Sequence, residues 1–215
     1  GQARAYDAGK AVTMEHPEMD MYAYERFLAD GKTPFCGVDE AGRGPLAGPV
    51  CAAAVLLPEG LVIPGLNDSK KLTAKKRDAL YDIICESAVA FGIAFATVDE
   101  IEALNIKGAT YLAMNRAIAD MEPAPVLALV DGNDKNELDI PAIKVVKGDS
   151  LCASIAAASV LAKVTRDRYM DDMDALYPQY GFARHKGYGT AAHYAALREY
   201  GPSPIHRPTY LRKMH

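Results

Sequence analysis

The chain is 215 residues long, with 50% hydrophobic and 24% charged residues and a formal net charge of −4 at pH 7. This composition is typical of a globular protein with one substantial core. No apolar run reaches the roughly 18 to 20 residues that a membrane-spanning helix needs. Residues 1–20 carry scattered charges and no apolar stretch. We therefore expect neither membrane association nor a secretory signal.

The cysteines and the charge distribution add two expectations. The four cysteines form no C-x-x-C pair and fall within apolar runs, which favours a reduced, cytoplasmic protein. Residues 179–215 hold six Lys or Arg against one acid, whereas the remainder holds 18 basic and 27 acidic residues. A basic arm on an acidic body fits a bound polyanion, although a solvated basic helix has the same composition.

The apolar patterns predict strands that alternate with helices along the chain. A short helix is expected from Glu18 to Leu28, in a segment to which we assign no chemistry. Thr73 is the expected N-cap of a second helix, and Asp149 or Ser150 that of a long small-residue helix from Leu151 to about Arg168. The other expected helices are residues 99–104, 107–120 and 191–200, and the expected strands are residues 35–38, 50–57, 91–98, 126–130 and 143–146.

The segment 37–49, Gly-Val-Asp-Glu-Ala-Gly-Arg-Gly-Pro-Leu-Ala-Gly-Pro, places two adjacent carboxylates just before a glycine-flanked arginine. Burying Asp39 and Glu40 at the end of a core strand costs several kcal/mol each unless a cation compensates them. The glycines beside Arg43 leave the backbone open to close approach by a phosphate or a sugar. Taken alone, the segment also fits a strand that ends in a solvated tight turn.

Four further segments carry candidate polar groups. Asp131 follows an apolar run typical of a strand covered on both faces, and Asp149 precedes the long helix. Each is also explained by an ordinary turn or helix cap. Ser69 and Lys70 lie in a turn-rich connection that suits either a phosphate contact or an exposed loop. Glycines around Tyr188 leave its ring free to stack on a base or sugar, or to pack on its own helix.

Four acids fall at a strand end or a helix start: Asp39, Glu40, Asp131 and Asp149. If they meet in the fold, they cannot all stay ionised without divalent cations between them. Oxygen ligands without Cys or His at zinc spacing favour Mg²⁺ or Mn²⁺. Paired ions ringed by carboxylates beside a basic groove are the arrangement for in-line phosphodiester cleavage.

A series of motifs in this order resembles the type 2 ribonucleases H, the bacterial ribonuclease HII family. The resemblance covers about residues 35–208 and departs from the family at Ala41, where many members carry valine. The motifs are residues 37–49, Asn67-Asp68-Ser69-Lys70-Lys71-Leu72, Asp131-Gly132-Asn133, Lys147-Gly148-Asp149, residues 156–167 and His185-Lys186-Gly187-Tyr188-Gly189-Thr190.

The resemblance implies a fold and a division of the chain. The implied fold is an α/β ribonuclease H-like fold, with a mixed central β-sheet flanked by helices and a helical C-terminal segment. Residues 1–34 would be an N-terminal extension and residues 35–177 the catalytic core. Residues 178–215 would be a basic helical segment that completes the substrate groove.

The resemblance also implies roles for individual residues. The four acids match the catalytic acids that bind metal, with two Mg²⁺ or Mn²⁺ ions. The segment Gly42-Arg43-Gly44 matches the one that reads the ribose 2′-hydroxyl. Tyr188 matches the tyrosine that stacks on the sugar at a DNA–RNA junction. Ser69, Lys70 and Lys163 match positions near the phosphate backbone, whereas we interpret Arg166 as structural.

By the same resemblance, the expected activity is cleavage of the RNA strand of RNA–DNA hybrids and of single ribonucleotides embedded in duplex DNA. The cut falls 5′ of the ribonucleotide and leaves 3′-hydroxyl and 5′-phosphate ends, which would remove misincorporated ribonucleotides and RNA primers. These nucleic acids are the expected partners, and no obligate protein partner is inferred. One rival is another Mg²⁺-dependent phosphoryl-transfer enzyme, but its G-x-x-x-x-G-K-[ST] loop is missing. A hybrid-binding module without catalysis is a second rival, which the four intact acids oppose.

Overall fold

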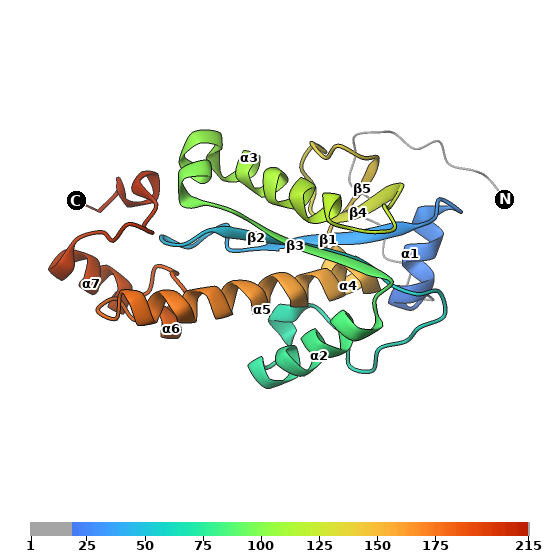
Figure 1. Ribbon diagram of the computed structural model, residues 1–215, viewed down its shortest axis with the longest axis horizontal. Helices are drawn as coiled ribbons and strands as arrows, with labels where there is room; N and C mark the ends of the chain where they lie inside the picture. Colours follow the sequence, from blue (N-terminus) through green and yellow to red (C-terminus); the bar gives the residue numbers. More distant parts are fainter. Residues whose placement is uncertain (1–18, 215) are drawn as a thin grey trace.

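One mixed sheet forms the centre of the computed structural model, which describes residues 19–214 (Figure 1). The strand order is β3-β2-β1-β4-β5. Strands β1 to β3 pair antiparallel, whereas β4 pairs parallel with both β1 and β5. The strands are β1 (Phe35–Ala41), β2 (Val50–Leu56), β3 (Ala90–Ala96), β4 (Leu127–Asp131) and β5 (Ala142–Val145).

Helices cover both faces of this sheet (Figure 1). The helix α3 (Val98–Ala119) packs on one face, and α5 (Ala153–Leu176) packs on the other with α2 (Ala74–Ser87). This arrangement, with its helical C-terminal segment, confirms the predicted fold class. The remaining helices are α1 (Met21–Ala29), α4 (Gly148–Leu151), α6 (Phe182–His185) and α7 (Ala191–Tyr200), with short 3-10 turns η1 (Ser69–Lys71) and η2 (Pro208–Leu211).

Small residues allow α5 to lie directly against the central strands. The whole of β2 is buried, and its alternate residues pack toward α3 on one face and toward α5 on the other. Gly37 in β1 has no room for a side chain, because a Cβ there would lie 2.2 Å from the carbonyl carbon of Ser154. The start of α5 is therefore fixed against the middle of β1.

The long helix differs from its predicted span at both ends. As α5 it begins at Ala153 and continues to Leu176. Cys152 is extended (φ −123°, ψ 127°) and separates α5 from the single turn α4. Neither Asp149 nor Ser150 is therefore the N-cap of the long helix, because both lie inside α4. Lys147, whose backbone is in the left-handed region (φ 54°, ψ 35°), is the N-cap residue of that turn.

Capping residues explain other boundaries. Thr73 accepts a backbone N–H at the start of α2, as predicted. Thr97 and Glu100 form a capping box at the start of α3, so β3 ends at Ala96 and not at residue 98 as predicted. The non-helical Asn105 (φ 61°) kinks α3 between the two stretches that the sequence indicated. No helix within residues 19–214 is both long and apolar enough to cross a membrane.

The predicted N-terminal helix is present as α1, and it has a structural task that the sequence did not indicate. Asp20 caps it, while the predicted first residue, Glu18, lies outside the described residues. Glu25 of α1 is buried and accepts the Ser154 N–H at 2.8 Å, and the Ser154 hydroxyl donates to the same oxygen. A side chain from α1 thus accepts from a backbone N–H in the first turn of α5, which has no partner within that helix.

Candidate active site

The parallel pairing of β1 and β4 brings acids from distant parts of the chain to one edge of the sheet. Val38 stands opposite Val130, so Asp39, near the end of β1, lies beside Asp131, the last residue of β4. Asp149 lies in α4, directly after β5, and its N–H donates to Asp131 Oδ1 at 3.2 Å. One carboxylate oxygen from each of the three acids lies within 4.8 Å of the other two.

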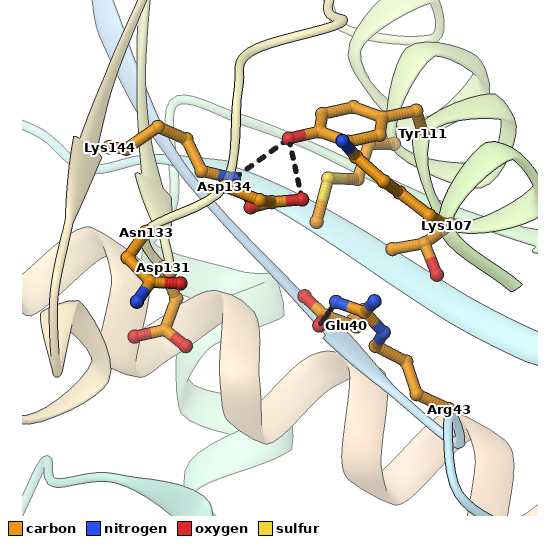
Figure 2. Close-up of a pocket in the computed structure, with 11 residues that line it drawn as sticks. Glu40, Arg43, Lys107, Tyr111, Asp131, Asn133, Asp134 and Lys144 are labelled. Carbon is orange, nitrogen blue, oxygen red and sulfur yellow. Dashed lines mark hydrogen bonds and ion pairs between the residues drawn. The ribbon is translucent and has the colours of Figure 1, made fainter. Parts of the chain in front are cut away.

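Glu40 is close to this group but approaches from the other face of the sheet. Alternation along β1 turns Asp39 toward the α5 side and Glu40 toward the α3 side. Glu40 and Asp131 both line a cavity of about 300 Å³ (Figure 2). Glu40 Oε1 lies 3.6 Å from Arg43 Nη1, whereas its Oε2 is buried with no hydrogen-bond partner within residues 19–214. The four predicted acids thus straddle the end of β1.

The electrostatics of this cluster oppose full ionisation. Burial raises the pKa of Asp39 well above its usual range, and the charges of Glu40, Asp131 and Asp149 raise it further. Burial and then the charge of Asp131 raise the pKa of Asp149 to about 6. Burial also raises the pKa of Glu40. Oxygen-only donors, an unpartnered buried oxygen and this excess of negative charge together fit a divalent cation.

The connection before α2 contributes one cation and one further acid. Asp68, which the sequence did not single out, is buried, caps η1 and raises the pKa of Asp149. Burial lowers the pKa of Lys70, but the charges of Asp149 and Asp68 outweigh it and raise that pKa. The neighbouring Ser69 is buried, and its N–H donates to Ser159 Oγ on α5 at 3.1 Å. The structure therefore brings Lys70 into the field of the acids, with Ser69 anchored behind it.

Lys163 and the cavity wall hold other charged pairs. Lys163 forms an ion pair with Asp167 one turn along α5, at 3.0 Å. In the cavity wall, Lys144 Nζ lies 2.9 Å from Asp134 Oδ1 and 3.0 Å from the Tyr111 hydroxyl (Figure 2). Sequence reasoning did not identify this group, because its members come from β5, α3 and the loop after β4.

Tyr188 and the segment 42–44 lie side by side, although they are more than 140 residues apart in the sequence. A Cβ built on Gly44 would lie 3.7 Å from Tyr188 Cε1. Tyr188 remains 42% exposed. Gly42 has φ +94°, and a Cβ there would lie 2.0 Å from Arg166 Nε, so only glycine fits. The structure thus places the ring of an exposed tyrosine against Gly44 of the glycine-flanked segment.

Two buried arginines hold the loop around these residues. Arg166 donates to the carbonyls of Ala47, Pro49 and Lys186 at 2.8–2.9 Å, in agreement with its interpretation as structural. Arg207, from the C-terminal segment, donates to three other carbonyls of the same loop. Sequence reasoning missed Arg207, because a partner made of backbone carbonyls leaves no side-chain pattern.

This fold and site define the class of protein. A mixed sheet that gathers carboxylates at the ends of parallel strands, with helices on both faces, is the architecture of ribonuclease H-like enzymes. The family described as Ribonuclease HII matches residues 36–214. The chain belongs to the ribonuclease HII family and is a ribonuclease H endonuclease.

Individual relatives and solved structures agree with this assignment. The chain is 61% identical over 175 residues to the ribonuclease HII of Dechloromonas aromatica (strain RCB), covering 81% of this chain and 89% of the relative. It is 59% identical over 179 residues to that of Delftia acidovorans (strain DSM 14801 / SPH-1), covering 83% and 76%. The ribonuclease H2 from Pyrococcus horikoshii OT3 superposes with a TM-score of 0.69 at 25% identity, covering 84% and 96%. Bst-RNase HIII in complex with Mn²⁺ shares the fold, with a TM-score of 0.62 at 18% identity, covering 87% and 68%.

Proposed function

We propose that this enzyme hydrolyses the RNA strand of RNA–DNA hybrids and cuts 5′ of single ribonucleotides embedded in duplex DNA. The products would carry 3′-hydroxyl and 5′-phosphate ends, and the role in the cell would be removal of misincorporated ribonucleotides and RNA primers. One observation carries the proposal. Three carboxylate oxygens converge within 4.8 Å at a sheet edge, and an exposed tyrosine lies against Gly44 of the glycine-flanked segment that follows β1.

The four acids would hold two divalent ions, Mg²⁺ or Mn²⁺: Asp39, Glu40, Asp131 and Asp149. When bound, such ions activate the attacking water and neutralise the departing 3′-oxyanion. The Mn²⁺ complex of Bst-RNase HIII, a protein of the same fold, supports this choice of cation. Asp131 belongs to the three-acid group and also lines the cavity with Glu40, so it would help to hold the cations beside both.

Recognition of the substrate would fall to the other side chains. The ring of Tyr188 would stack on the sugar of the ribonucleotide, and the backbone of residues 42–44 would contact its 2′-hydroxyl, the group that distinguishes RNA from DNA. Lys70, already in the field of the acids, would neutralise a phosphate oxygen. Ser69 and Lys163 would border the same phosphate path, with Lys163 released from Asp167.

We keep the functional division into residues 1–34, 35–177 and 178–215 as part of this proposal. The last segment supplies Tyr188, α6, α7 and Arg207, so it would complete the substrate groove. The extension contributes α1, which packs on the start of α5 through Glu25. Its expected contribution is therefore to stability and not to chemistry.

A cleavage assay tests the function. The protein is incubated with Mg²⁺ or Mn²⁺ and three labelled duplexes: an RNA–DNA hybrid, a DNA duplex with one ribonucleotide, and the matched all-DNA duplex. We expect cuts in the first two, with the second cut 5′ of the ribonucleotide. Asp39→Asn should abolish cleavage but retain substrate binding, whereas the exposed Asp82→Asn on α2 is the control and should cleave normally. An uncut hybrid, or equal cleavage of the all-DNA duplex, would contradict the proposal.

A further inference from the structure

Two carbonyl groups of the glycine-flanked segment, those of Gly42 and Arg43, accept hydrogen bonds from one buried side chain. Arg207 has no exposed surface, and its Nη2 lies 2.6 Å from the Gly42 carbonyl oxygen. Its Nη1 lies 2.9 Å from the Arg43 carbonyl oxygen and its Nε 2.9 Å from that of Gly48. The Tyr210 hydroxyl donates to the Arg43 carbonyl as well, at 2.9 Å. The guanidinium therefore fixes the direction of two successive peptide groups.

The geometry of the peptide unit determines which backbone groups face away from Arg207. Both peptide bonds are trans, so the C=O and N–H of each unit point in opposite directions. With the carbonyls of Gly42 and Arg43 directed at Arg207, the N–H groups of Arg43 and Gly44 face away from it. Neither N–H donates a hydrogen bond to any group within residues 19–214, and both residues are exposed. The result is a pair of open donors, and the ring of Tyr188 lies next to Gly44, which carries one of them.

We propose that Arg207 is a specificity-determining positioning residue, which presents the Arg43 and Gly44 N–H groups to the ribose and thereby sets the preference for a 2′-hydroxyl. This inference rests on the proposed function, in which the same segment contacts the ribose. Arg207 touches no substrate atom and acts only through the two peptide groups. A 2′-hydroxyl oxygen accepts hydrogen bonds from both N–H groups, whereas a 2′-deoxyribose offers neither of them an acceptor.

The chemistry of arginine suits this task in a way that lysine does not. A planar guanidinium donates in several fixed directions at once and holds three carbonyls in place, whereas an ammonium is a compact charge on a flexible stem. Burial lowers the pKa of Arg207 to about 10, so the side chain still carries its charge at neutral pH. Substitution by lysine keeps that charge and removes the planar arrangement of donors.

The backbone around Arg207 is anchored independently of its side chain. The Arg207 N–H donates to the Leu46 carbonyl at 2.8 Å, and His206 forms a β-bridge with Ala47. The N–H of Gly48 donates to the Ile205 carbonyl, also at 2.8 Å. A side-chain substitution at position 207 therefore leaves the segment attached to the loop and frees the peptide planes to turn.

The test compares binding to two DNA duplexes that differ by a single 2′-hydroxyl. Affinities are measured by fluorescence anisotropy with Mg²⁺ in an Asp39→Asn background, which prevents cleavage. In this parent protein we expect tighter binding to the duplex with one ribonucleotide. We define the ratio as the dissociation constant for the all-DNA duplex divided by that for the duplex with one ribonucleotide. Adding Arg207→Lys should lower this ratio about tenfold, the factor associated with one or two lost hydrogen bonds. Affinity for the all-DNA duplex should stay unchanged, which a merely structural role would not ensure.

Two further variants make the test decisive. Tyr210→Phe removes one of the two donors to the Arg43 carbonyl and should lower the ratio about two- to threefold. Arg212→Lys changes an exposed arginine of the same segment and should leave the ratio intact. Thermal unfolding of each variant establishes that it is folded.

The possible outcomes separate this inference from the proposed function. A folded Arg207→Lys protein with the ratio of the parent overturns the inference. If Arg207→Lys does not fold, Tyr210→Phe decides, and an unchanged ratio overturns the inference in the same way. A parent that binds both duplexes equally instead contradicts the ribose-reading role of residues 42–44, and the inference falls with it.

Discussion

His206 and His193 share a hydrogen bond between their Nε2 atoms, 2.8 Å apart. The Ser203 N–H donates to His206 Nδ1 at 2.9 Å, so His206 carries its proton on Nε2 and donates it toward His193. His193 in turn donates from Nδ1 to the Tyr188 carbonyl at 2.8 Å. Both rings are neutral in this relay, which connects the C-terminal loop to the backbone that carries Tyr188.

This relay predicts a loss of stability in mild acid, because protonating either ring would set two N–H groups against each other. Burial, and then the charges of His193 and His185, lower the pKa of His206 to about 4. His185 stacks on His193 with ring centroids 4.2 Å apart, and burial also lowers the pKa of His193. Between about pH 6.5 and 4 the unfolded chain binds more protons than the folded one. The contribution of His206 is thus complete above pH 6.5 and falls by about 2 kcal/mol toward pH 4.

Urea unfolding at pH 7.5, 6.0 and 5.0 measures this effect. In His206→Gln the side-chain amide replaces the ring donor and does not titrate, so the variant should lose less stability than the wild type between pH 7.5 and 5.0. If the variant loses as much stability as the wild type between pH 7.5 and 5.0, the histidine relay does not cause the loss.

The titration of Glu25 should change the stability with pH in the direction opposite to that of His206. Burial raises the pKa of this carboxyl to about 7, although Ser154 donates two hydrogen bonds that lower it. Between about pH 4.5 and 7 the folded protein binds more protons than the unfolded chain, so stability falls as the pH rises through this window. Glu25→Gln retains an acceptor for Ser154 without the charge. We expect it to be about 1–2 kcal/mol more stable than the wild type at pH 8 and to lose the advantage near pH 5.

The same urea series tests this prediction, with Glu86→Gln, an exposed position on α2, as the matched control. The control should follow the wild type at every pH. A Glu25→Gln protein that is less stable than the wild type at pH 8 would mean that the ionised carboxylate stabilises the start of α5.

How much of this site the sequence predicted depends on what each residue contacts. Asp131 ends β4 as predicted, because an apolar run followed by a polar residue marks where a buried strand reaches the edge of a sheet. Asp39 was predicted at the end of its strand, but it lies inside β1, which continues to Ala41. The fold class followed from the same alternation of strands and helices. Asp149 was assigned to the wrong helix terminus, because the left-handed Lys147 and the extended Cys152 create a separate turn that no periodicity indicates.

Contacts between buried side chains and backbone groups could not be predicted from the sequence. The Gly42 carbonyl and Arg207 are 165 residues apart, and Glu25 and the Ser154 N–H are 129 residues apart. Carbonyl and amide groups occur at every position, so neither contact restricts the identity of the residue that supplies them. Only the fold shows which buried polar side chain satisfies which backbone group.

In the absence of metal, repulsion within the acid cluster should make the wild type less stable than Asp39→Asn, which lacks one of the acids. Like charges held within 4.8 Å in a buried site repel one another, and Asp39→Asn removes one of them. In EDTA we expect Asp39→Asn to melt a few degrees above the wild type, as about 1 kcal/mol implies for a chain of this size. Added Mg²⁺ or Mn²⁺ should raise the melting temperature of the wild type much more than that of the variant.

Thermal shift measurements with and without the cations check this pair of effects. Asp82→Asn, at an exposed position of α2, should behave as the wild type in both conditions. Equal cation-induced shifts in the wild type and in Asp39→Asn would exclude Asp39 as a metal ligand.

Truncation of Tyr188 should weaken substrate recognition with little effect on the stability of the protein. The residue is 42% exposed, and its ring lies against Gly44 and the Arg166 guanidinium, whose central carbon is 5.9 Å from the ring centroid. Truncation therefore removes little buried surface. We expect Tyr188→Ala to melt within a few degrees of the wild type but to lose roughly 10- to 100-fold in kcat/KM on a duplex with one ribonucleotide, the range that stacking on one base or sugar provides. Tyr188→Phe keeps the ring and should retain most of the activity. If Tyr188→Ala cleaves this duplex as fast as the wild type, the ring does not contact the substrate, and the exposed donors of residues 43 and 44 would have to recognise the ribonucleotide without it.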